Sequence, residues 1–228
     1  MYLLSSITLT PLWIVPFYLL HNYLIPSWCN TKRPGQLASH LISLTHATFV
    51  TVASALMLST HPNLITFSNL IVLSSSYFLY DIWYMLCYSP SRMYLIHHLA
   101  TLAVWYLSLA YQCGENLILF SVLLGEYTNV IRIPWRIAKE NGYTNLASRL
   151  ETIFRYNFLI ARCILAPIHV IFHISTILNL PMPLAGRLTI MLSASTLLVG
   201  SVIWSSRLIH KSETDRLKLS LLIEELET

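Results

Sequence analysis

Long apolar runs separated by short polar connections dominate the pattern along the chain. A membrane-spanning helix needs about 20 mainly apolar residues. The runs of this kind lie at about 7–25, 38–59, 67–87, 95–111, 117–137, 155–178 and 188–209. The pattern therefore predicts an all-α polytopic membrane protein with seven transmembrane helices. Composition agrees, because 55% hydrophobic and 11% charged residues with a mean hydropathy of +0.60 exclude a soluble domain of this length.

The basic residues predict how the helices are oriented in the membrane. With seven spans, eleven of the fourteen Lys and Arg residues fall on one side, as for Lys32 and Arg33 in the first connection and Lys211 after the last span. Positive charge favours the cytosolic side. We therefore expect a cytosolic C-terminus and a lumenal or external N-terminus. The net charge of +4 is spread over these connections, so it orients the chain and does not indicate nucleic-acid binding.

The first span and the cysteines exclude several other classes. No Lys or Arg precedes Lys32, so the first span lacks the basic flank of a secretory signal and is expected to be retained. Cys29, Cys87, Cys113 and Cys163 form no C-x-x-C or Cys/His spacing. Neither a disulfide framework nor a metal site is predicted.

Several ionisable residues fall inside the predicted spans, where they are costly and usually functional. Two adjacent histidines, His97 and His98, lie near the start of the fourth span. A helix rises about 1.5 Å per residue, so the position of a residue within its span gives its depth in the membrane. By this measure the histidine pair and four other ionisable residues all lie within roughly 3–12 Å of the cytosolic interface. Those other residues are His46, Asp81, Arg132 and Arg162. A shared depth predicts that they converge on one cavity.

Polar residues also share helix faces, since residues three and four apart are neighbours on a helix. The stripes are Ser74, Tyr77, Asp81, Tyr84 and Tyr88 in the third span; Glu126, Asn129, Arg132 or Ile133, and Arg136 in the fifth; and Arg155, Arg162, His169 and His173 in the sixth. Such stripes are expected to point into the bundle. Pro134 and Pro167 each free the carbonyl four residues earlier, which can bend these helices and open a cavity.

Structural roles compete with functional ones at each of these positions. A histidine such as His46 in a helix is often only a hydrogen-bonded packing residue. Asp81 with Arg162 or Arg132 can be a structural ion pair, and the His97/His98 pair can simply make a hydrogen bond to another helix.

Certain short motifs resemble the TLC domain, which ceramide synthases share with translocating-chain-associated membrane proteins and small lipid-linked proteins. These motifs are Ser43-x-x-His46, Tyr80-Asp81, the run from His97 to Leu102, and Gly125-Glu126-Tyr127-Thr128-Asn129 followed by Arg132. The resemblance covers residues 36–210. It implies a barrel of six helices around a cavity, preceded by a first transmembrane helix and cytosolic loop (1–35) and followed by a cytosolic tail (211–228).

Ceramide synthases carry a block of the form H-D-x-S-D one helix after the histidine pair. Here its histidine is replaced by Gly125, its first carboxylate by Glu126 and its second by Asn129. The chain is in this respect more similar to the small TLC-domain proteins than to full ceramide synthases. The departure speaks against acyl transfer.

The resemblance leaves three functions open. The favoured one is a protein of the endoplasmic reticulum membrane that binds or handles a lipid, such as a sphingolipid or fatty acyl chain, and influences membrane lipid composition. The second is an acyl-CoA-dependent sphingoid-base N-acyltransferase. The third is a non-enzymatic assembly or trafficking subunit, with the cytosolic Leu217, Leu221, Leu222 and Leu226 as a docking segment.

The roles expected of the site residues follow from these alternatives. In an enzyme, His97 or His98 would be the base or acyl acceptor and Asp81 would orient it. Head-group or lipid binding is expected of His46, Glu126, Asn129, Arg132 and Arg162, because the guanidinium fork binds phosphate or carboxylate bidentately. No cofactor is expected, apart from acyl-CoA as a co-substrate of the enzyme alternative.

Overall fold

The computed structural model describes residues 1–25, 33–59, 65–88 and 92–227, with side chains described as far as residue 206. Every regular element in these ranges is helical. Seven helices are long and apolar enough to cross a membrane: Tyr2–Leu24, Pro34–Ser59, Phe67–Tyr88, Arg92–Tyr111, Glu115–Glu140, Thr144–Leu178 and Leu184–Ser206. The all-helical class and the seven predicted spans are therefore confirmed. The predictions for Cys29 and Lys32 lie outside the described residues.

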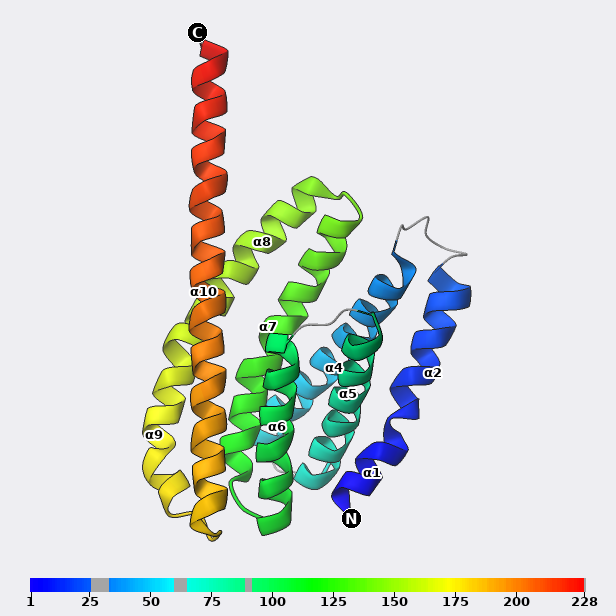
Figure 1. Cartoon of the computed structure of the whole chain (residues 1–228), viewed down its shortest axis with the longest axis vertical. Helices are drawn as coiled ribbons and strands as arrows, with labels where there is room; N and C mark the ends of the chain where they lie inside the picture. Colours follow the sequence, from blue (N-terminus) through cyan, green and yellow to red (C-terminus); the bar gives the residue numbers. More distant parts are fainter. Residues whose placement is uncertain (26–32, 60–64, 89–91, 228) are drawn as a thin grey trace.

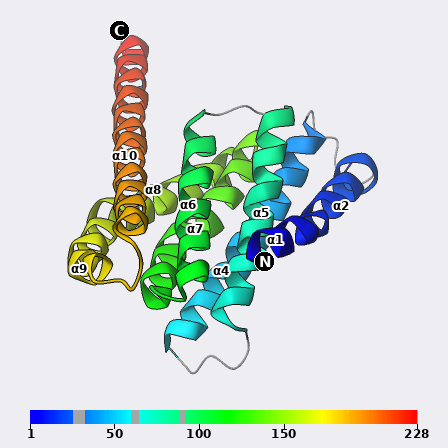
Figure 2. The same cartoon turned by 60° about the horizontal axis from the view of Figure 1, so that its bottom comes forward.

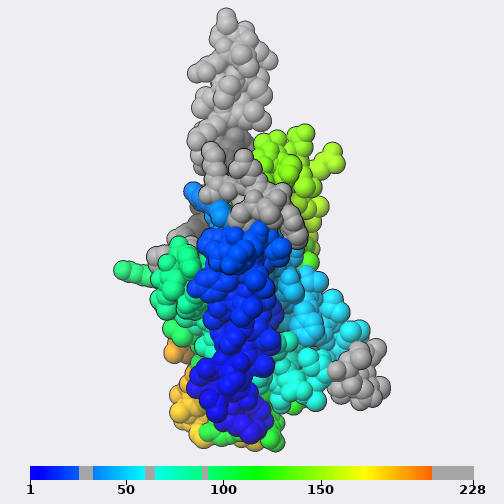
Figure 3. Space-filling view, turned by 90° about the vertical axis from the view of Figure 1, so that its right-hand side faces the viewer, coloured from blue at the N-terminus to red at the C-terminus, as the bar shows by residue number. Residues whose placement is uncertain are grey.

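The first span is broken into short pieces by its own sequence. Helix α1 (Tyr2–Leu9) is followed by α2 (Pro11–Leu19) and the π-helical turn η1 (Leu20–Leu24). Pro11 suits the first position of α2, where a backbone N–H would have no partner. Pro16 lies inside α2 and removes a helical hydrogen bond just before η1. Figures 1 and 3 show this segment lying along the outside of the bundle.

The other helices pack side by side. Helix α4 (Pro34–Ser59) lies against α7 (Glu115–Glu140) and α5 (Phe67–Tyr88), and α5 also contacts α6 (Arg92–Tyr111). Helix α10 (Leu184–Glu227) packs against α6 and against α9 (Ala166–Leu178), while α7 contacts α8 (Thr144–Leu159) and α9. The N-terminal segment packs on α5 and α4. Figure 2 shows the same arrangement from another side.

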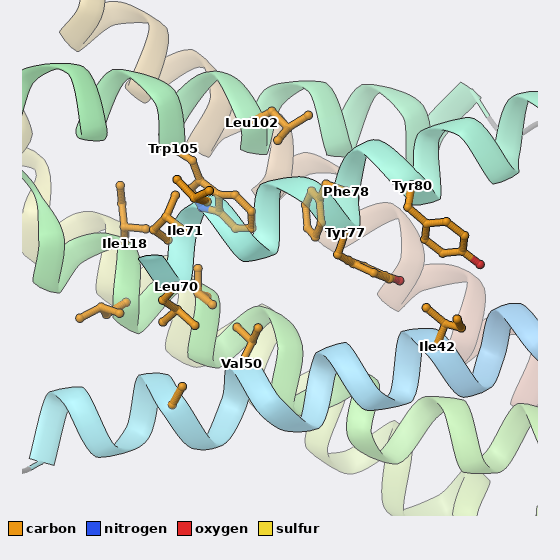
Figure 4. Packing of buried hydrophobic residues seen from close by; sticks show 14 of the residues in the cluster. Ile42, Val50, Leu70, Ile71, Tyr77, Phe78, Tyr80, Leu102, Trp105 and Ile118 are labelled. Carbon is orange, nitrogen blue, oxygen red and sulfur yellow. The ribbon is translucent and has the colours of Figure 1, made fainter. Parts of the chain in front are cut away.

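The main core lies where α4, α5, α6 and α7 meet (Figure 4). Val50, Leu70 and Trp105 from three of these helices are almost fully buried there. Between helices in a membrane the stabilisation comes from close packing, which small residues favour. Ser74, Ser75 and Ser76 in α5 are completely buried and allow the neighbouring helices to approach.

The sixth span differs from its prediction, because the helix begins at Thr144 instead of about 155. Its 35 residues rise about 52 Å, which exceeds a hydrocarbon core of about 30 Å. The additional turns are polar and carry the pair Arg155–Glu151, with 2.7 Å between Nη2 and Oε1. Helix α8 therefore includes an extension beyond the span, which packs on α7 through Phe154.

The last helix continues beyond its span. The backbone of α10 is helical to Glu227 and projects past the other helices (Figure 1). The two termini lie at opposite ends of the molecule in this view, as an odd number of spans requires. The proposed docking residues Leu217, Leu221, Leu222 and Leu226 lie outside the described side chains.

Candidate functional site

A cavity of about 320 Å³ lies between α5, α6, α7, the start of the π-helical turn η2 (Ile160–Leu165) and α10. We call it the polar cavity. It brings together seven of the eight residues predicted for the site: Asp81, His97, His98, Glu126, Asn129, Arg132 and Arg162. Five of the six residues expected from their shared depth to converge on one cavity therefore line it, and His46 does not. The roles of these residues stay predictions.

The eighth residue, His46, lies behind the wall of the polar cavity. Its ring is completely buried and stacks on Tyr77, with ring centroids 3.8 Å apart. Its Nδ1 is 3.9 Å from Oε2 of Glu126, too far for a hydrogen bond. Tyr77 in turn donates its hydroxyl to Ser43 at 2.8 Å. His46 therefore supports the wall and faces the Glu126 carboxylate without binding it.

Asp81 and His98 form the tightest polar contact of the site. Oδ2 of Asp81 is 2.7 Å from Nε2 of His98, and the His98 ring stacks on Phe78 with centroids 4.4 Å apart. Next to it, the ring of His97 lies edge-on at 5.5 Å. Because the carboxylate accepts a hydrogen bond from Nε2–H, it fixes the orientation of the His98 imidazole. Nδ1 of His98 is buried without a hydrogen-bond partner among the described residues.

Three polar side chains on one face of α7 form a chain of hydrogen bonds. Asn129 Nδ2 donates to Glu126 Oε2 at 3.0 Å, and Arg132 Nε donates to Asn129 Oδ1 at 3.0 Å. Arg132 Nη1 also donates to the Tyr94 hydroxyl at 2.9 Å. A side chain at position 129 must both donate and accept here, which an amide does and a carboxylate does not. These two hydrogen bonds therefore explain why Asn129, and not a carboxylate, suits this position of the motif.

Arg162 occupies the space beside Gly125. Its Nη2 donates to the Gly125 carbonyl at 3.2 Å, and a Cβ added at Gly125 would lie 3.9 Å from that nitrogen. In the described part of the chain neither Arg162 nor Arg132 has a carboxylate oxygen within 4.0 Å. Two guanidinium groups thus line the polar cavity with no ion pair of up to 4.0 Å among the described residues, although buried charges are normally paired.

An apolar pocket of about 120 Å³ continues the polar cavity toward the other end of the bundle. The two spaces share Phe78, His97, Glu126 and Arg162. From His97 to Ser108 the pocket follows α6 for roughly 16 Å. Its far end is lined by Cys113, and burial raises the pKa of the Cys113 thiol, so this end stays uncharged.

On its other side the polar cavity adjoins a wider opening of about 600 Å³, which we call the vestibule. Both spaces are lined by Asp81, Tyr94, Arg132 and Arg136. The outer part of the vestibule is polar, with Gln36 Nε2 donating to Glu140 Oε1 at 2.9 Å. Polar access, charged cavity and apolar pocket therefore follow one another along the bundle.

The polar stripe predicted on α7 faces the polar cavity, whereas the stripe predicted on the sixth span does so only in part. Glu126, Asn129, Arg132, Ile133 and Arg136 all line the polar cavity. In the sixth span Arg162 does so, but Arg155 pairs with Glu151 and His173 lines a groove on the outside of the bundle. The π-helical turn η2 lies between Arg155 and His169. A π turn inserts extra residues per turn, so the stripe does not stay on one face.

Sequence reasoning missed Trp13, which lies on the N-terminal segment. Its Nε1 donates to Ser76 Oγ at 2.8 Å, and its ring meets His46 and Tyr77 edge-on, with centroids 5.8 and 5.5 Å away. A tryptophan among many apolar residues carries no sequence signal for such a role. Tyr94, the partner of Arg132, also escaped notice because tyrosines are common near membrane interfaces.

The family can now be assigned. A family model for the TLC domain matches residues 36–210, which contain every predicted site residue. The chain belongs to the TLC-domain family. Comparisons with curated proteins and with solved structures find no match. In this TLC-domain protein, Trp13 comes from outside the matched region and still contacts the cluster behind the polar cavity.

The site is built from hydrogen-bonding and charged side chains without a metal-binding arrangement in the described ranges. No group of three or more His, Cys, Asp or Glu side chains there is placed to hold a metal ion. What the geometry offers is an oriented imidazole beside a second histidine, two guanidinium groups, and an adjoining apolar pocket.

Proposed function

We propose that this TLC-domain protein holds a membrane lipid and thereby influences membrane lipid composition. The observation that carries the proposal is that the polar cavity and the apolar pocket are contiguous through His97, Glu126 and Arg162. An amphipathic molecule needs such a pair of spaces, one for its polar group and one for its chain.

The charges in the polar cavity favour an anionic polar group. Arg132 and Arg162 line it without carboxylate partners within 4.0 Å in the described chain. A guanidinium binds phosphate or carboxylate through two parallel hydrogen bonds. The lipid is therefore a fatty acid, a phospholipid or a phosphorylated sphingolipid, with Asn129 and Tyr94 holding Arg132 in place.

The same proposal includes the arrangement of the helices in the membrane. We propose that α4 to α10 form a six-helix barrel around the two spaces, which the neighbour relations of α4, α7, α9, α10, α6 and α5 support. The one-sided distribution of basic residues supports a lumenal N-terminus and a cytosolic C-terminus, with the endoplasmic reticulum as the expected membrane.

One observation favours a second function, N-acyl transfer from acyl-CoA to a long-chain base. Asp81 orients His98 at 2.7 Å, directly beside His97 and at the head of the apolar pocket. In such a reaction a histidine takes the ammonium proton, the freed amine nitrogen attacks the thioester carbonyl, a C–N bond forms and the C–S bond breaks, and CoA leaves as the thiol with that proton. Gly125 and Asn129 argue against it, because they replace two motif residues of the ceramide synthases.

The experiment compares lipids that stay with the purified protein. Wild type, the double variant Arg132→Gln/Arg162→Gln, and the control Arg149→Gln, which alters an exposed arginine on α8, are purified and their lipids are measured by mass spectrometry. Each charge-assisted contact is worth about 1.5–3 kcal/mol, so retention in the double variant should fall by at least about tenfold. Equal amounts of anionic lipid in all three proteins would refute the proposal.

A further inference from the structure

A second opening lies on the outside of the bundle, at the end away from the C-terminal tail. It is a groove of about 450 Å³ between the end of α4, the start of α7, and α9. We call it the lateral groove. Its apolar walls include Leu58, Phe120 and Ile168, and its polar groups are Asn116, His169 and His173. All three helices belong to predicted spans, so we expect the lateral groove to face the acyl chains of the bilayer.

His169 separates the lateral groove from the apolar pocket, because its side chain lines both. On α7, Leu117 and Ser121 line the apolar pocket, while their neighbours Asn116 and Phe120 line the lateral groove. At this point the barrier between bilayer and interior is a layer of side chains.

The barrier is held by a small set of contacts. Nε2 of His169 is 3.1 Å from both Ser121 Oγ and the Leu117 carbonyl, and its ring lies 4.6 Å from that of Phe120. Ser121 also donates to the Leu117 carbonyl at 2.8 Å. The single Nε2 hydrogen cannot satisfy both neighbours at once. Rotation of one imidazole therefore breaks only one or two hydrogen bonds.

The backbone next to His169 is irregular on its N-terminal side. The π-helical turn η2 (Ile160–Leu165) leads directly into α9, and Pro167 lies two residues before His169. Proline leaves the carbonyl four residues earlier without its helical partner, and π turns are frequent at functional positions in helices. Helix α9 is thus connected to α8 through a segment that can shift its register.

The polar groups of the lateral groove are unusual on a face that meets hydrocarbon. Phe172 is 77% exposed beside it, whereas Nδ1 of His173 is buried without a hydrogen-bond partner among the described residues. Ionisable side chains in a membrane usually line pathways or bind ligands. The apolar pocket lies directly behind His169, which favours an acyl chain as the occupant of the lateral groove.

We propose that the lateral groove is the entrance through which an acyl chain of a bilayer lipid passes between α7 and α9 into the apolar pocket, with His169 and Phe120 as its movable barrier. This rests on the proposed lipid-holding function and adds the route by which the lipid arrives.

The test follows a photoreactive chain over time. Palmitic acid with a diazirine at its chain end is added to phosphatidylcholine vesicles that contain the full chain, and the sample is illuminated after increasing delays. Mass spectrometry then locates the adducts. In wild type we expect adducts at Ile168 and Phe172 first, and adducts at Cys113 or Trp105, which line the apolar pocket, afterwards.

A variant and a matched control separate the route from the binding. Ile168→Trp fills the lateral groove, whereas Ile171→Trp places the same side chain on an exposed position of α9 that lines neither space. We expect adducts at Cys113 to form about tenfold more slowly in Ile168→Trp, the change expected from an obstructing side chain. Their final amount should be unchanged, and Ile171→Trp should behave as wild type.

The outcomes distinguish the two proposals. Adducts at Cys113 that form at the wild-type rate in Ile168→Trp would overturn the lateral entrance and leave the lipid-holding function standing. Adducts that never reach Cys113 or Trp105 in wild type would overturn both. If Ile168→Trp does not fold, the wild-type adducts decide, because labelling of Ile168 and Phe172 no stronger than that of Ile171 contradicts the entrance.

Discussion

Substituting Gly125 tests whether Arg162 has taken the place of the missing motif histidine. A Cβ at Gly125 would lie 3.9 Å from Arg162 Nη2, which is an ordinary van der Waals distance. Gly125→Ala should therefore fit, and it should stabilise the helix by up to about 1 kcal/mol because alanine is the better helix former. A histidine side chain reaches further and must displace the guanidinium.

The cost of that displacement can be estimated from the contacts. Arg162 loses its hydrogen bond of 3.2 Å to the Gly125 carbonyl, and bonds from charged groups are worth about 1.5–3 kcal/mol. Overpacking adds about 1–3 kcal/mol, part of which the helix propensity of histidine offsets. We expect Gly125→His to lower the free energy of unfolding by about 2–5.5 kcal/mol and to reduce retention of anionic lipid.

Unfolding of the purified variants, followed by circular dichroism in a denaturing detergent titration, measures this difference. Arg162→Leu provides the matched background, because Gly125→His should cost far less once the guanidinium is gone. The double-mutant cycle should therefore give a coupling energy of more than about 1 kcal/mol. If Gly125→His is as stable as Gly125→Ala in the presence of Arg162, Arg162 does not occupy the space of the histidine.

Two further predictions concern the histidine pair and the orientation. His97→Gln/His98→Gln should still fold, because glutamine can donate to Asp81 in place of His98 Nε2, but the variant should lose the effect on membrane lipids. If it fully restores the lipid profile of cells that lack the protein, the histidine pair has only a structural role. A cysteine introduced after Lys211 should react with an impermeant maleimide only from the cytosolic side, whereas labelling from the lumen would reverse the proposed topology.

The sequence predicts most of the fold because hydropathy and length suffice to define a membrane span. The ends are less predictable. The sixth helix begins at Thr144 because polar turns of α8 continue the helix beyond the hydrocarbon core. Hydropathy identifies only the apolar part of a helix, so it does not predict these polar turns. Hydropathy also cannot reveal η2, because a π turn leaves the apolar composition of the segment unchanged. It only changes the helix face on which later residues such as His173 lie.

The location of the site was predictable for a different reason. Ionisable residues are so costly in hydrocarbon that Asp81, His98 and Arg132 must face the interior, and a regular helix such as α7 keeps its stripe on one face. The contact between Trp13 and the cluster behind the polar cavity was not predictable, because Trp13 and its hydrogen-bond partner Ser76 are 63 residues apart in the sequence. Only the packing of the N-terminal segment on α5 brings them together.

Each of the two departures from the ceramide synthase pattern has its own contacts in the structure. Asn129 bridges Glu126 and Arg132 because it donates to one and accepts from the other, and an aspartate at this position would repel the Glu126 carboxylate. Gly125 leaves the space in which Arg162 reaches the helix backbone. With one carboxylate fewer than the ceramide synthase motif, the polar cavity carries less negative charge beside Arg132 and Arg162. The residues at these two positions are therefore compatible with the proposed anionic lipid group, and the oriented His98 and its neighbour His97 lie where the polar cavity meets the apolar pocket.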